Sequence, residues 1–442
     1  MTDTIFARAS GAGKAGVAVY RLSGPDAFSI FRELVGKRIK YRAAEMAVLR
    51  DPASGRVIDK GLAILFENPK SYTGEDVAEF HLHGARAVEI ELYEALSGLG
   101  ARPAEPGEFT LRALKNGKLD LAQVEALADL IDSETTLQKM QALGQLDGRL
   151  SALAEGWRAQ ILSVMAPLEA DIDFPDEGDV PAAIAASAGP AILSLQESLT
   201  AFLNQSISAR KIREGVSIAV IGAPNAGKSS LVNALAGSDV AIVSDIAGTT
   251  RDIVETRLDL GGVVAAIADT AGLRGATGDV IEAEGMKRAR ARAEAADIRV
   301  LVEDLTTGGQ AGEGRDLIKP GDIVVWNKAD LAKAPEMKQV GVTELALSAK
   351  TGAGMAALVD ALTEKAAGGG FSDGPALTRM RHVHAVEEAL AALARAQDLI
   401  ARAPELAAED ARLAARALGK ITGAVGVEDV LGEIFSSFCI GK

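Results

Sequence analysis

Some segments of the chain contain short apolar runs, as strands do, and others have apolar residues at helical spacing. Changes in how these two patterns combine divide the chain into predicted domains. Short apolar runs at residues 16–22 and 62–66 predict strands, since turn-forming residues separate them. Apolar residues at helical spacing in 27–35 and 87–99 predict helices between and after these strands. Residues 1–118 are therefore expected to form an α+β domain.

The rest of the chain contains two segments with helical patterns and, between them, a segment that mixes strand and helix patterns. Heptad-like apolar spacing over 119–212 predicts helices, and residues 373–442 return to Ala- and Leu-rich helix. Between them, residues 213–372 alternate short β-rich runs with helices, as in a parallel α/β sheet. The strand-like runs are Ser217–Ile221, Val263–Ala268, Ile323–Trp326 and Leu345–Leu347. The similar flanks predict an α/β domain inserted into one all-α helical domain, and four consecutive units are the alternative.

Composition narrows the possible functions. The 442 residues include 47 Lys and Arg against 61 Asp and Glu, so the chain should not hold nucleic acid by a pervasive positive field. Its one cysteine, Cys439, cannot form an internal disulfide. We find neither a basic leader before an apolar core nor an apolar run near the ~18 residues that span a bilayer. These features predict a cytoplasmic protein.

A glycine-rich loop between a strand-like run and a helical run predicts a phosphate site. The segment is Gly222-Ala-Pro-Asn-Ala-Gly-Lys228-Ser229, in which glycines let several backbone N–H groups and a helix N-terminus face an anion. Lys228 is expected to contact the β- and γ-phosphates, and the Ser229 hydroxyl to hold Mg²⁺. The predicted nucleotide contacts in this loop are Asn225, Ala226, Gly227, Lys228, Ser229 and Ser230.

Three downstream motifs select GTP. A polar loop offers Thr250 as a second Mg²⁺ ligand, and an apolar strand ends in Asp269, near the water shell of the ion. After another strand, the Asp330 carboxylate can accept from both N1–H and the exocyclic amine of guanine, which adenine cannot satisfy. The further predicted contacts are Ser244, Thr249, Thr270, Ala271, Gly272, Asn327, Lys328, Ser348, Ala349 and Lys350. The set predicts a P-loop, Ras-like GTPase.

Leu273 stands where Ras-type enzymes carry a glutamine that orients the attacking water. A leucine cannot hydrogen-bond water, so another group must do so. Nearby acids are Asp279, Glu282 and Glu284, which could equally be solvated acids at a helix start. Two nearby arginines, Arg251 and Arg274, are expected in surface ion pairs rather than as arginine fingers.

Several segments in one order resemble the MnmE (TrmE) family of bacterial tRNA-modification GTPases over essentially the whole chain. The guanine-nucleotide motifs share this resemblance, and an inserted G domain agrees with it. The other segments are Tyr20-Arg-Leu-Ser-Gly24, Tyr72-Thr-Gly-Glu-Asp76, Pro106-Gly-Glu-Phe-Thr110, Lys118-Leu-Asp-Leu-Ala122, Gly248-Thr-Thr-Arg-Asp252 and Cys439-Ile-Gly-Lys442.

The resemblance implies a partner, a cofactor and an oligomeric state. The flavoprotein MnmG (GidA) would be the partner in adding an aminomethyl-type group to C5 of the wobble uridine of certain tRNAs, and tRNA would be reached mainly through MnmG. The N-terminal domain would form a homodimer and bind 5-formyltetrahydrofolate or a related tetrahydrofolate. Its folate contacts map to Arg21, Glu79, Lys118 and Lys442. Without the resemblance, these charges would be interpreted as surface salt bridges.

The resemblance also implies that the G domains dimerise with GTP and that K⁺ replaces an arginine finger. The K⁺ ligands map to Asn225, Ser244, Ile246 and Thr249. A water-orienting glutamate maps to Glu282, which joins Lys228 and Thr250 as expected catalytic residues. The stretch 269–285 is one residue longer than the family pattern, so Glu284 remains a competitor. Cys439 is either a buried apolar residue or part of the tRNA-modifying site.

Two other functions compete with this interpretation. A ribosome-assembly GTPase of the Era or Der type would need a basic RNA-binding domain or a second G domain, and the acidic chain shows neither. A folate-dependent transferase with a merely regulatory G domain would not need fast hydrolysis.

Overall fold

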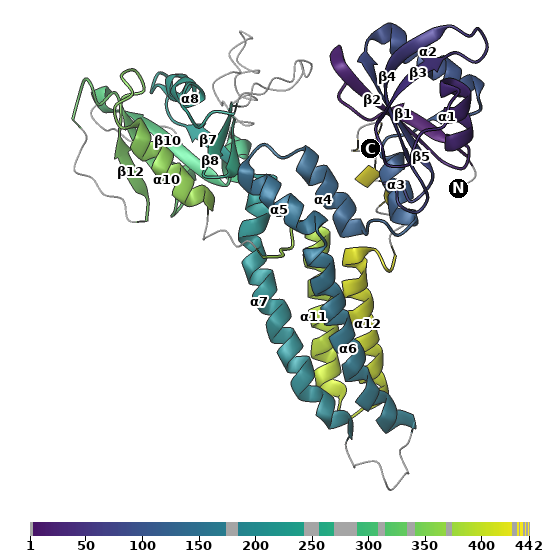
Figure 1. Cartoon of the computed structure of the whole chain (residues 1–442). Coiled ribbons are helices and arrows are strands. Elements are labelled where there is room, and N and C mark those ends of the chain that lie inside the picture. The colour runs from purple at the N-terminus through teal and green to yellow at the C-terminus, as the bar shows by residue number, and fades with distance from the viewer. Residues whose placement is uncertain are drawn as a thin grey trace, which may run out of the picture. The chain divides into compact units, whose positions relative to one another are not determined.

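The computed structural model describes most of the chain and separates it into two compact units (Figure 1). The first unit comprises residues 1–128, 146–188 and 391–442, and the second comprises 129–145 and 189–390. The described residues are 3–173, 184–242, 256–268, 290–307, 314–333, 341–367 and 374–426, with 431, 432, 434, 435, 438 and 441.

A six-stranded sheet forms the N-terminal part of the first unit, in the order β3-β4-β5-β2-β1-β6. Its strands pair antiparallel except for β1 with β6. The strands are β1 (Ile5–Arg8), β2 (Ala15–Ser23), β3 (Glu45–Arg50), β4 (Val57–Phe66), β5 (Val77–Gly84) and β6 (Arg102–Pro103). The helices are α1 (Ala27–Val35), α2 (Arg86–Gly98) and α3 (Glu108–Lys115). The predicted α+β fold is confirmed.

Alternation of buried and partly exposed residues over 18–22 of β2 and 78–82 of β5 separates the two faces of this sheet. Tyr20 and Phe80 are buried on the face against which α1 and α2 pack. The opposite face carries Arg21, Glu79 and His81, because neighbouring residues of a strand point to opposite sides. Large apolar side chains on this second face remain exposed: Val17 (61%), Met46 (61%) and Leu62 (39%).

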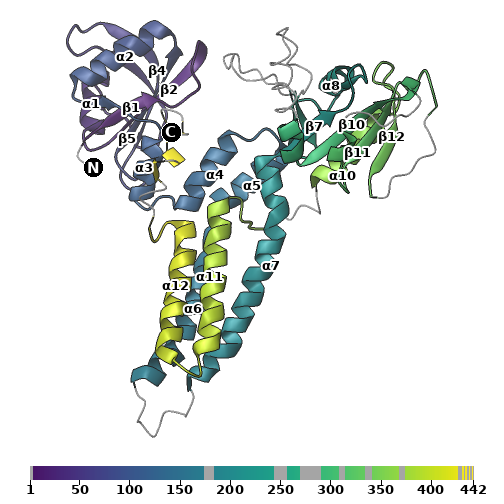
Figure 2. The ribbon, with the colours of Figure 1, turned by 180° about the vertical axis from the view of Figure 1, so that it is seen from behind.

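Long helices dominate the predicted helical segments: α4 (Leu121–Ile131), α5 (Thr136–Leu146), α6 (Arg149–Asp173), α7 (Gly189–Glu214), α11 (Met380–Leu399) and α12 (Pro404–Thr422). In the first unit, α6 and α12 lie side by side in both views (Figures 1 and 2). Small residues of α12, such as Ala411 and Ala414, are fully buried, which lets the two helices approach closely. Within the described residues, no helix meets the length and apolarity needed to cross a membrane.

A second six-stranded sheet lies in the second unit, in the order β12-β11-β10-β7-β9-β8. All its neighbours are parallel except β8 with β9. The strands are β7 (Val216–Ile221), β8 (Thr256–Leu260), β9 (Val263–Ala268), β10 (Ile298–Asp304), β11 (Ile323–Asn327) and β12 (Thr343–Ala346), with α8 (Lys228–Ala236) and α10 (Met355–Ala367). This is the predicted α/β P-loop domain.

Segments on both sides of this α/β domain meet within the second unit. The backbone N–H of Leu377 donates to Ser206 Oγ of α7 at 3.0 Å. The Thr378 hydroxyl donates to Gln145 Oε1 at 3.0 Å, and both side chains are buried. These contacts join residues 171 and 233 positions apart and show an α/β domain inserted between helical segments. The exact boundaries 118, 212 and 372 stay predictions.

Helix α5 contacts the tight turn between β8 and β9. Thr135 Oγ1, just before α5, donates to the carbonyl oxygen of Gly262 at 2.7 Å. A Cβ atom on Gly262 would lie 2.3 Å from Leu137 Cγ, and its φ is +96°. Only glycine allows this close approach with a left-handed backbone. Leu137 packs there against the core of the α/β domain.

Candidate functional site

The predicted phosphate loop runs from the end of β7 at Ile221 to the start of α8 at Lys228. Asn225 and Gly227 have left-handed backbones, with φ of +64° and +98°. Lys228 Nζ donates to the carbonyl oxygens of Gly222 at 2.7 Å and Ala223 at 2.9 Å. The ammonium group thus lies within the curve of the loop, at the N-terminus of a helix, where a phosphate is favoured.

Asn327, the last residue of β11, joins two predicted nucleotide loops. Its buried side chain (3% exposed) donates from Nδ2 to the carbonyl oxygen of Ala226 at 2.9 Å. Its Oδ1 accepts from the backbone N–H of Ala349 at 3.1 Å. A Cβ atom on Gly227 would lie 2.2 Å from Asn327 Nδ2, so the glycine makes room for this amide. The phosphate loop and the Ser348–Lys350 loop are therefore held together.

Lys328 and Asp330 follow this asparagine at the same edge of the sheet. Lys328 has φ of +65°, and its Nζ forms an ion pair with Asp304 Oδ2 at 2.5 Å. Burial alone would raise the pKa of Asp304, but hydrogen bonds from Lys328 and Thr306 outweigh it and lower that pKa. Asp304 therefore stays ionised and holds Lys328. Asp330 is exposed, which leaves its carboxylate accessible to a base.

Asp304 was not among the residues predicted from the sequence. It ends β10, whose carboxyl end lies beside that of β11, with Asp304 in register with Asn327. An acidic residue at the end of a predicted parallel strand indicates a site residue, because the carboxyl ends of these strands form one edge of the sheet, where ligands bind. In this chain, β10 itself was missed, so the signal was lost with it.

Several predicted residues lie outside the described residues. They are Ser244, Ile246, Thr249, Thr250, Asp269, Thr270, Ala271, Gly272 and Glu282, with Arg251, Leu273, Arg274, Asp279, Glu284, Cys439 and Lys442. Strand β9 ends at Ala268, directly before Asp269 in the sequence.

In the N-terminal domain, Arg21 and Glu79 face each other on β2 and β5. Arg21 Nε donates to Glu79 Oε1 at 2.9 Å. The Arg21 guanidinium also lies over the Tyr72 ring, 4.9 Å from its centroid, which is a cation–π contact. His81 Nε2 is buried 3.5 Å from Glu79 Oε2 and makes no hydrogen bond within the described residues.

Tyr72 links this pair to a hollow of about 460 Å³. Burial raises the pKa of Tyr72, and its hydroxyl lies 2.7 Å from Thr110 Oγ1. The hollow is lined by Arg42, Phe66, Lys70, Ser71, Tyr72 and Lys118. Arg21, Glu79 and Lys118 thus gather around one tyrosine. Sequence reasoning missed Arg42, Phe66 and Lys70, since none of them belongs to the motifs that carry the resemblance.

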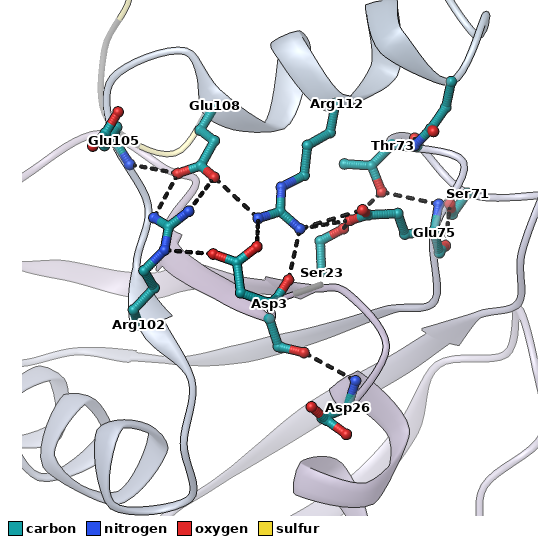
Figure 3. Close-up of polar contacts among 12 residues, drawn as sticks. Asp3, Ser23, Asp26, Ser71, Thr73, Glu75, Arg102, Glu105, Glu108 and Arg112 are labelled. Carbon is teal, nitrogen blue, oxygen red and sulfur yellow. Dashed lines mark hydrogen bonds and ion pairs between the residues drawn. The ribbon is translucent and has the colours of Figure 1, made fainter. Parts of the chain in front are cut away.

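A buried ion network supports the loop that carries Tyr72 (Figure 3). Arg112 is fully buried and pairs with Asp3 at 3.0 Å, Glu75 at 3.1 Å and Glu108 at 3.0 Å. Arg102 pairs with Glu108 at 2.6 Å. Glu75 and Glu108 belong to two of the segments that carry the family resemblance, and their observed role is to neutralise a buried arginine.

Residues near the end of the sequence pack against the same domain. Phe435 and Phe438 are buried with Val124, and Gly107 has no room for a Cβ beside Phe435. A Cβ on Gly441 would lie 2.0 Å from the carbonyl oxygen of Arg8, so the backbone passes directly over the end of β1.

Known protein families match both the N-terminal domain and the rest of the chain. The model of the MnmE helical domain matches residues 121–439, and that of the GTP-binding protein TrmE N-terminus matches residues 4–118. The tRNA modification GTPase MnmE of Parvibaculum lavamentivorans is 50% identical over 447 residues, covering 100% of both chains. That of Caulobacter vibrioides is 49% identical over 450 residues, again covering 100% of both.

Among solved structures, an Era variant from Aquifex aeolicus bound to GDP·AlF4⁻ is 26% identical, with a TM-score of 0.27. The match covers 40% of this chain and 66% of that chain, and a likeness of this size carries no functional argument.

Proposed function

The chain belongs to the MnmE family of tRNA modification GTPases, and from this membership we propose that it works with the flavoprotein MnmG (GidA) in the cytoplasm. The pair adds a carboxymethylaminomethyl-type group to C5 of the wobble uridine of certain tRNAs, at the expense of GTP. The observation that carries the GTPase assignment is the Asn327 side chain, which joins the phosphate loop to the Ser348–Lys350 loop.

The described residues suit each part of GTP. Backbone N–H groups of the phosphate loop and the Lys228 ammonium receive the phosphates. Asp330 accepts from guanine, and backbone N–H groups near Ala349 donate to the guanine oxygen. The Ser229 hydroxyl is exposed in the first turn of α8, where it fits as an Mg²⁺ ligand together with Thr250. When bound, Mg²⁺ neutralises charge on the phosphates.

Hydrolysis is proposed to depend on K⁺ and on paired G domains. Asn225 is exposed and left-handed in the phosphate loop, so its amide oxygen is accessible to a cation that Ser244, Ile246 and Thr249 would also ligate. A bound monovalent cation neutralises charge that develops between the β- and γ-phosphates, the task of an arginine finger elsewhere. Since Leu273 cannot orient water, Glu282 is assigned that role.

Hydrolysis rates in K⁺ and in Na⁺ test this mechanism. We expect much faster hydrolysis in K⁺, and a collapse in Glu282→Ala with GTP binding retained. Glu284→Ala serves as the matched control. Equal rates in the two salts would reject the cation, and full activity in Glu282→Ala would move the role to another acid.

A homodimer is supported by the exposed face of the N-terminal sheet. Val17, Met46 and Leu62 present apolar surface there, and monomers seldom leave such side chains together in water. The proposed occupant of this face is a second copy of the chain, because a two-fold interface needs one self-complementary patch.

The proposed cofactor is 5-formyltetrahydrofolate, held by Arg21, Glu79, Lys118 and Lys442. Its fit is supported by the half-buried Arg21–Glu79 pair, by His81 Nε2, which is buried without a hydrogen bond to the described residues, and by the hollow beside Tyr72. When bound, the folate supplies a one-carbon unit. Cys439 is proposed to act at the same tRNA-modifying site.

Nucleoside analysis of tRNA tests the cellular role. Deletion of the protein should remove the C5 modification from wobble uridine, and Cys439→Ser should reduce it. Unaltered nucleosides beside an altered ribosome profile would favour ribosome assembly instead.

A further inference from the structure

The hollow beside Tyr72 is strongly cationic for its size. Arg42, Lys70 and Lys118 contribute three positive charges, and Phe66 and Tyr72 contribute two aromatic rings. Its lining, as far as the chain is described, includes no acidic side chain. Such a lining fits a ligand with several negative charges and an apolar or aromatic portion.

Two of these cationic side chains have no polar partner among the described residues. The side chains of Arg42 and Lys70 form neither hydrogen bonds nor ion pairs with the described residues, whereas Lys118 Nζ donates to the Pro69 carbonyl oxygen at 3.0 Å. The positive charges of Arg42 and Lys70 are therefore not neutralised by any described acidic side chain and are accessible to a ligand.

The backbone of Arg42 is held in an unusual conformation. Its φ of +58° is rare for a residue with a Cβ, and its N–H donates to the Leu65 carbonyl oxygen at 2.7 Å. The preceding Tyr41 stacks on Phe28, with ring centroids 5.4 Å apart. These contacts fix the base of the Arg42 side chain at the rim of the hollow.

Tyr72 belongs both to the hollow and to the Arg21–Glu79 site. A ligand held by Arg21 and Glu79 can therefore continue past Tyr72 toward Arg42 and Lys70. A folate has a suitable order of groups: a polar pterin, an aromatic aminobenzoyl ring, then a glutamate that can be extended by further γ-linked glutamates.

We propose that this hollow is the subsite for the carboxylates of a folate polyglutamate tail, and that Arg42 and Lys70 select polyglutamylated over monoglutamylated folate. This inference rests on the proposed folate function. RNA phosphates are the competing anion, but the volume of the hollow, about 460 Å³, is that of a small-molecule site.

Titration calorimetry on the full chain tests the proposal with mono- and triglutamyl 5-formyltetrahydrofolate. We expect the triglutamate to bind about tenfold more tightly at low salt, the size of two exposed ion pairs. This gain should shrink as salt rises, because exposed charges are screened. Arg42→Ala and Lys70→Ala should each remove part of the gain and leave the monoglutamate dissociation constant unchanged. Lys60→Ala, on β4 but outside the hollow, is the matched control.

The possible failures are distinguishable. If neither folate binds, the folate function itself fails. Equal affinity for the two folates, or an equal loss of both in Arg42→Ala, would overturn the tail subsite and leave folate binding intact. If Arg42→Ala and Lys70→Ala weaken tRNA binding and spare the triglutamate gain, the hollow serves RNA. An unchanged monoglutamate affinity in each variant shows that it has folded.

Discussion

Asn327 holds two loops with one amide, and its role shows how a single side chain shapes the nucleotide site. Replacement by alanine would leave the Ala226 carbonyl and the Ala349 N–H without their partner. Each unpaired buried group costs about 1–3 kcal/mol. The loops would then be free to separate, and the nucleotide would have to reorder them when it binds.

We therefore expect Asn327→Ala to weaken GTP binding about 10- to 100-fold. Titration with a fluorescent GTP analogue would measure this loss. Asn233→Ala, at an exposed position of α8, should leave the affinity unchanged. Unaltered affinity in Asn327→Ala would mean that the loops hold their positions without it.

The network around Arg112 should make the N-terminal domain sensitive to acid. Burial would raise the pKa of Glu108, but hydrogen bonds from Arg102, from the Glu105 N–H and from Arg112 lower it below 4.5. The pKa of Asp3 is lowered in the same way by Arg102 and Arg112, against burial. A lowered folded pKa stabilises the fold above the ordinary pKa, and this stability is lost as pH falls through the folded value.

Protection of α3 amides in the full chain should therefore be constant above pH 4.5 and decline below it. Hydrogen exchange, corrected for the intrinsic rate at each pH, measures this. Glu108→Gln should lower protection at neutral pH and flatten the decline. The same decline in both proteins would assign the acid sensitivity to other groups.

At the scale of secondary structure, sequence patterns predicted six of the twelve strands in the described residues and missed β1, β3, β5, β6, β8 and β10. Strand β10 contains Arg299, which looks solvent-exposed in the sequence, but its guanidinium is buried against Asp322 at 2.7 Å. Strand β8 alternates apolar with charged residues at the sheet edge and is short. Both strands are stabilised by residues distant in sequence, and the spacing of apolar residues within a short segment does not reveal such partners.

Site residues were likewise predicted where a short local segment carries their chemistry and missed where their role depends on residues distant in sequence. The phosphate loop and Asn327-Lys-Ala-Asp330 were predictable because short segments carry their chemistry. Arg112 was not, because its partner Asp3 lies 109 positions away. Arg42 joins the hollow through a left-handed turn and a bridge from Tyr41 to Leu65, which no spacing rule shows.

The contact between α5 and the β8–β9 turn gives a prediction about stability. Gly262→Ala would force a Cβ into Leu137 and strain a backbone with φ of +96°. We expect a loss of about 2–3 kcal/mol in the unfolding free energy of the α/β domain. Urea denaturation in a Trp157→Phe background would report it, since Trp326 then remains as the only tryptophan.

Two further variants separate the clash from the backbone strain. Gly262→Ala with Leu137→Ala should recover only the clash with Leu137 Cγ and Cδ1, since Leu137 Cβ would still lie 2.9 Å from the added Cβ, and a double-mutant cycle measures this part. Gly237→Ala, where the nearest atom lies 3.5 Å from an added Cβ, is the control and should be tolerated. A stable Gly262→Ala protein would show that α5 moves away at little cost.

For the whole molecule, the exposed sheet face predicts how two copies associate. Leu62→Asp would bury an unpaired carboxylate in the proposed dimer, which should raise its dissociation constant about 100-fold or more. Analytical ultracentrifugation would measure this. The control Ile90→Asp lies on α2, which packs on the other face of the sheet, and should remain dimeric. Dissociation in both variants, or in neither, would place the interface elsewhere.

The packing of Phe435, Phe438 and Gly441 on the N-terminal domain bears on how the protein is made. Residues 3–118 leave the ribosome early, yet Gly107 and Arg8 meet their partners only when Phe435 and Gly441 have been translated. Domains usually fold as units during synthesis, and the contacts of this one with Phe435 and Gly441 form only after most of the chain has been translated. A protein truncated before Phe435 therefore lacks these contacts with a domain that lies more than 300 positions away in sequence.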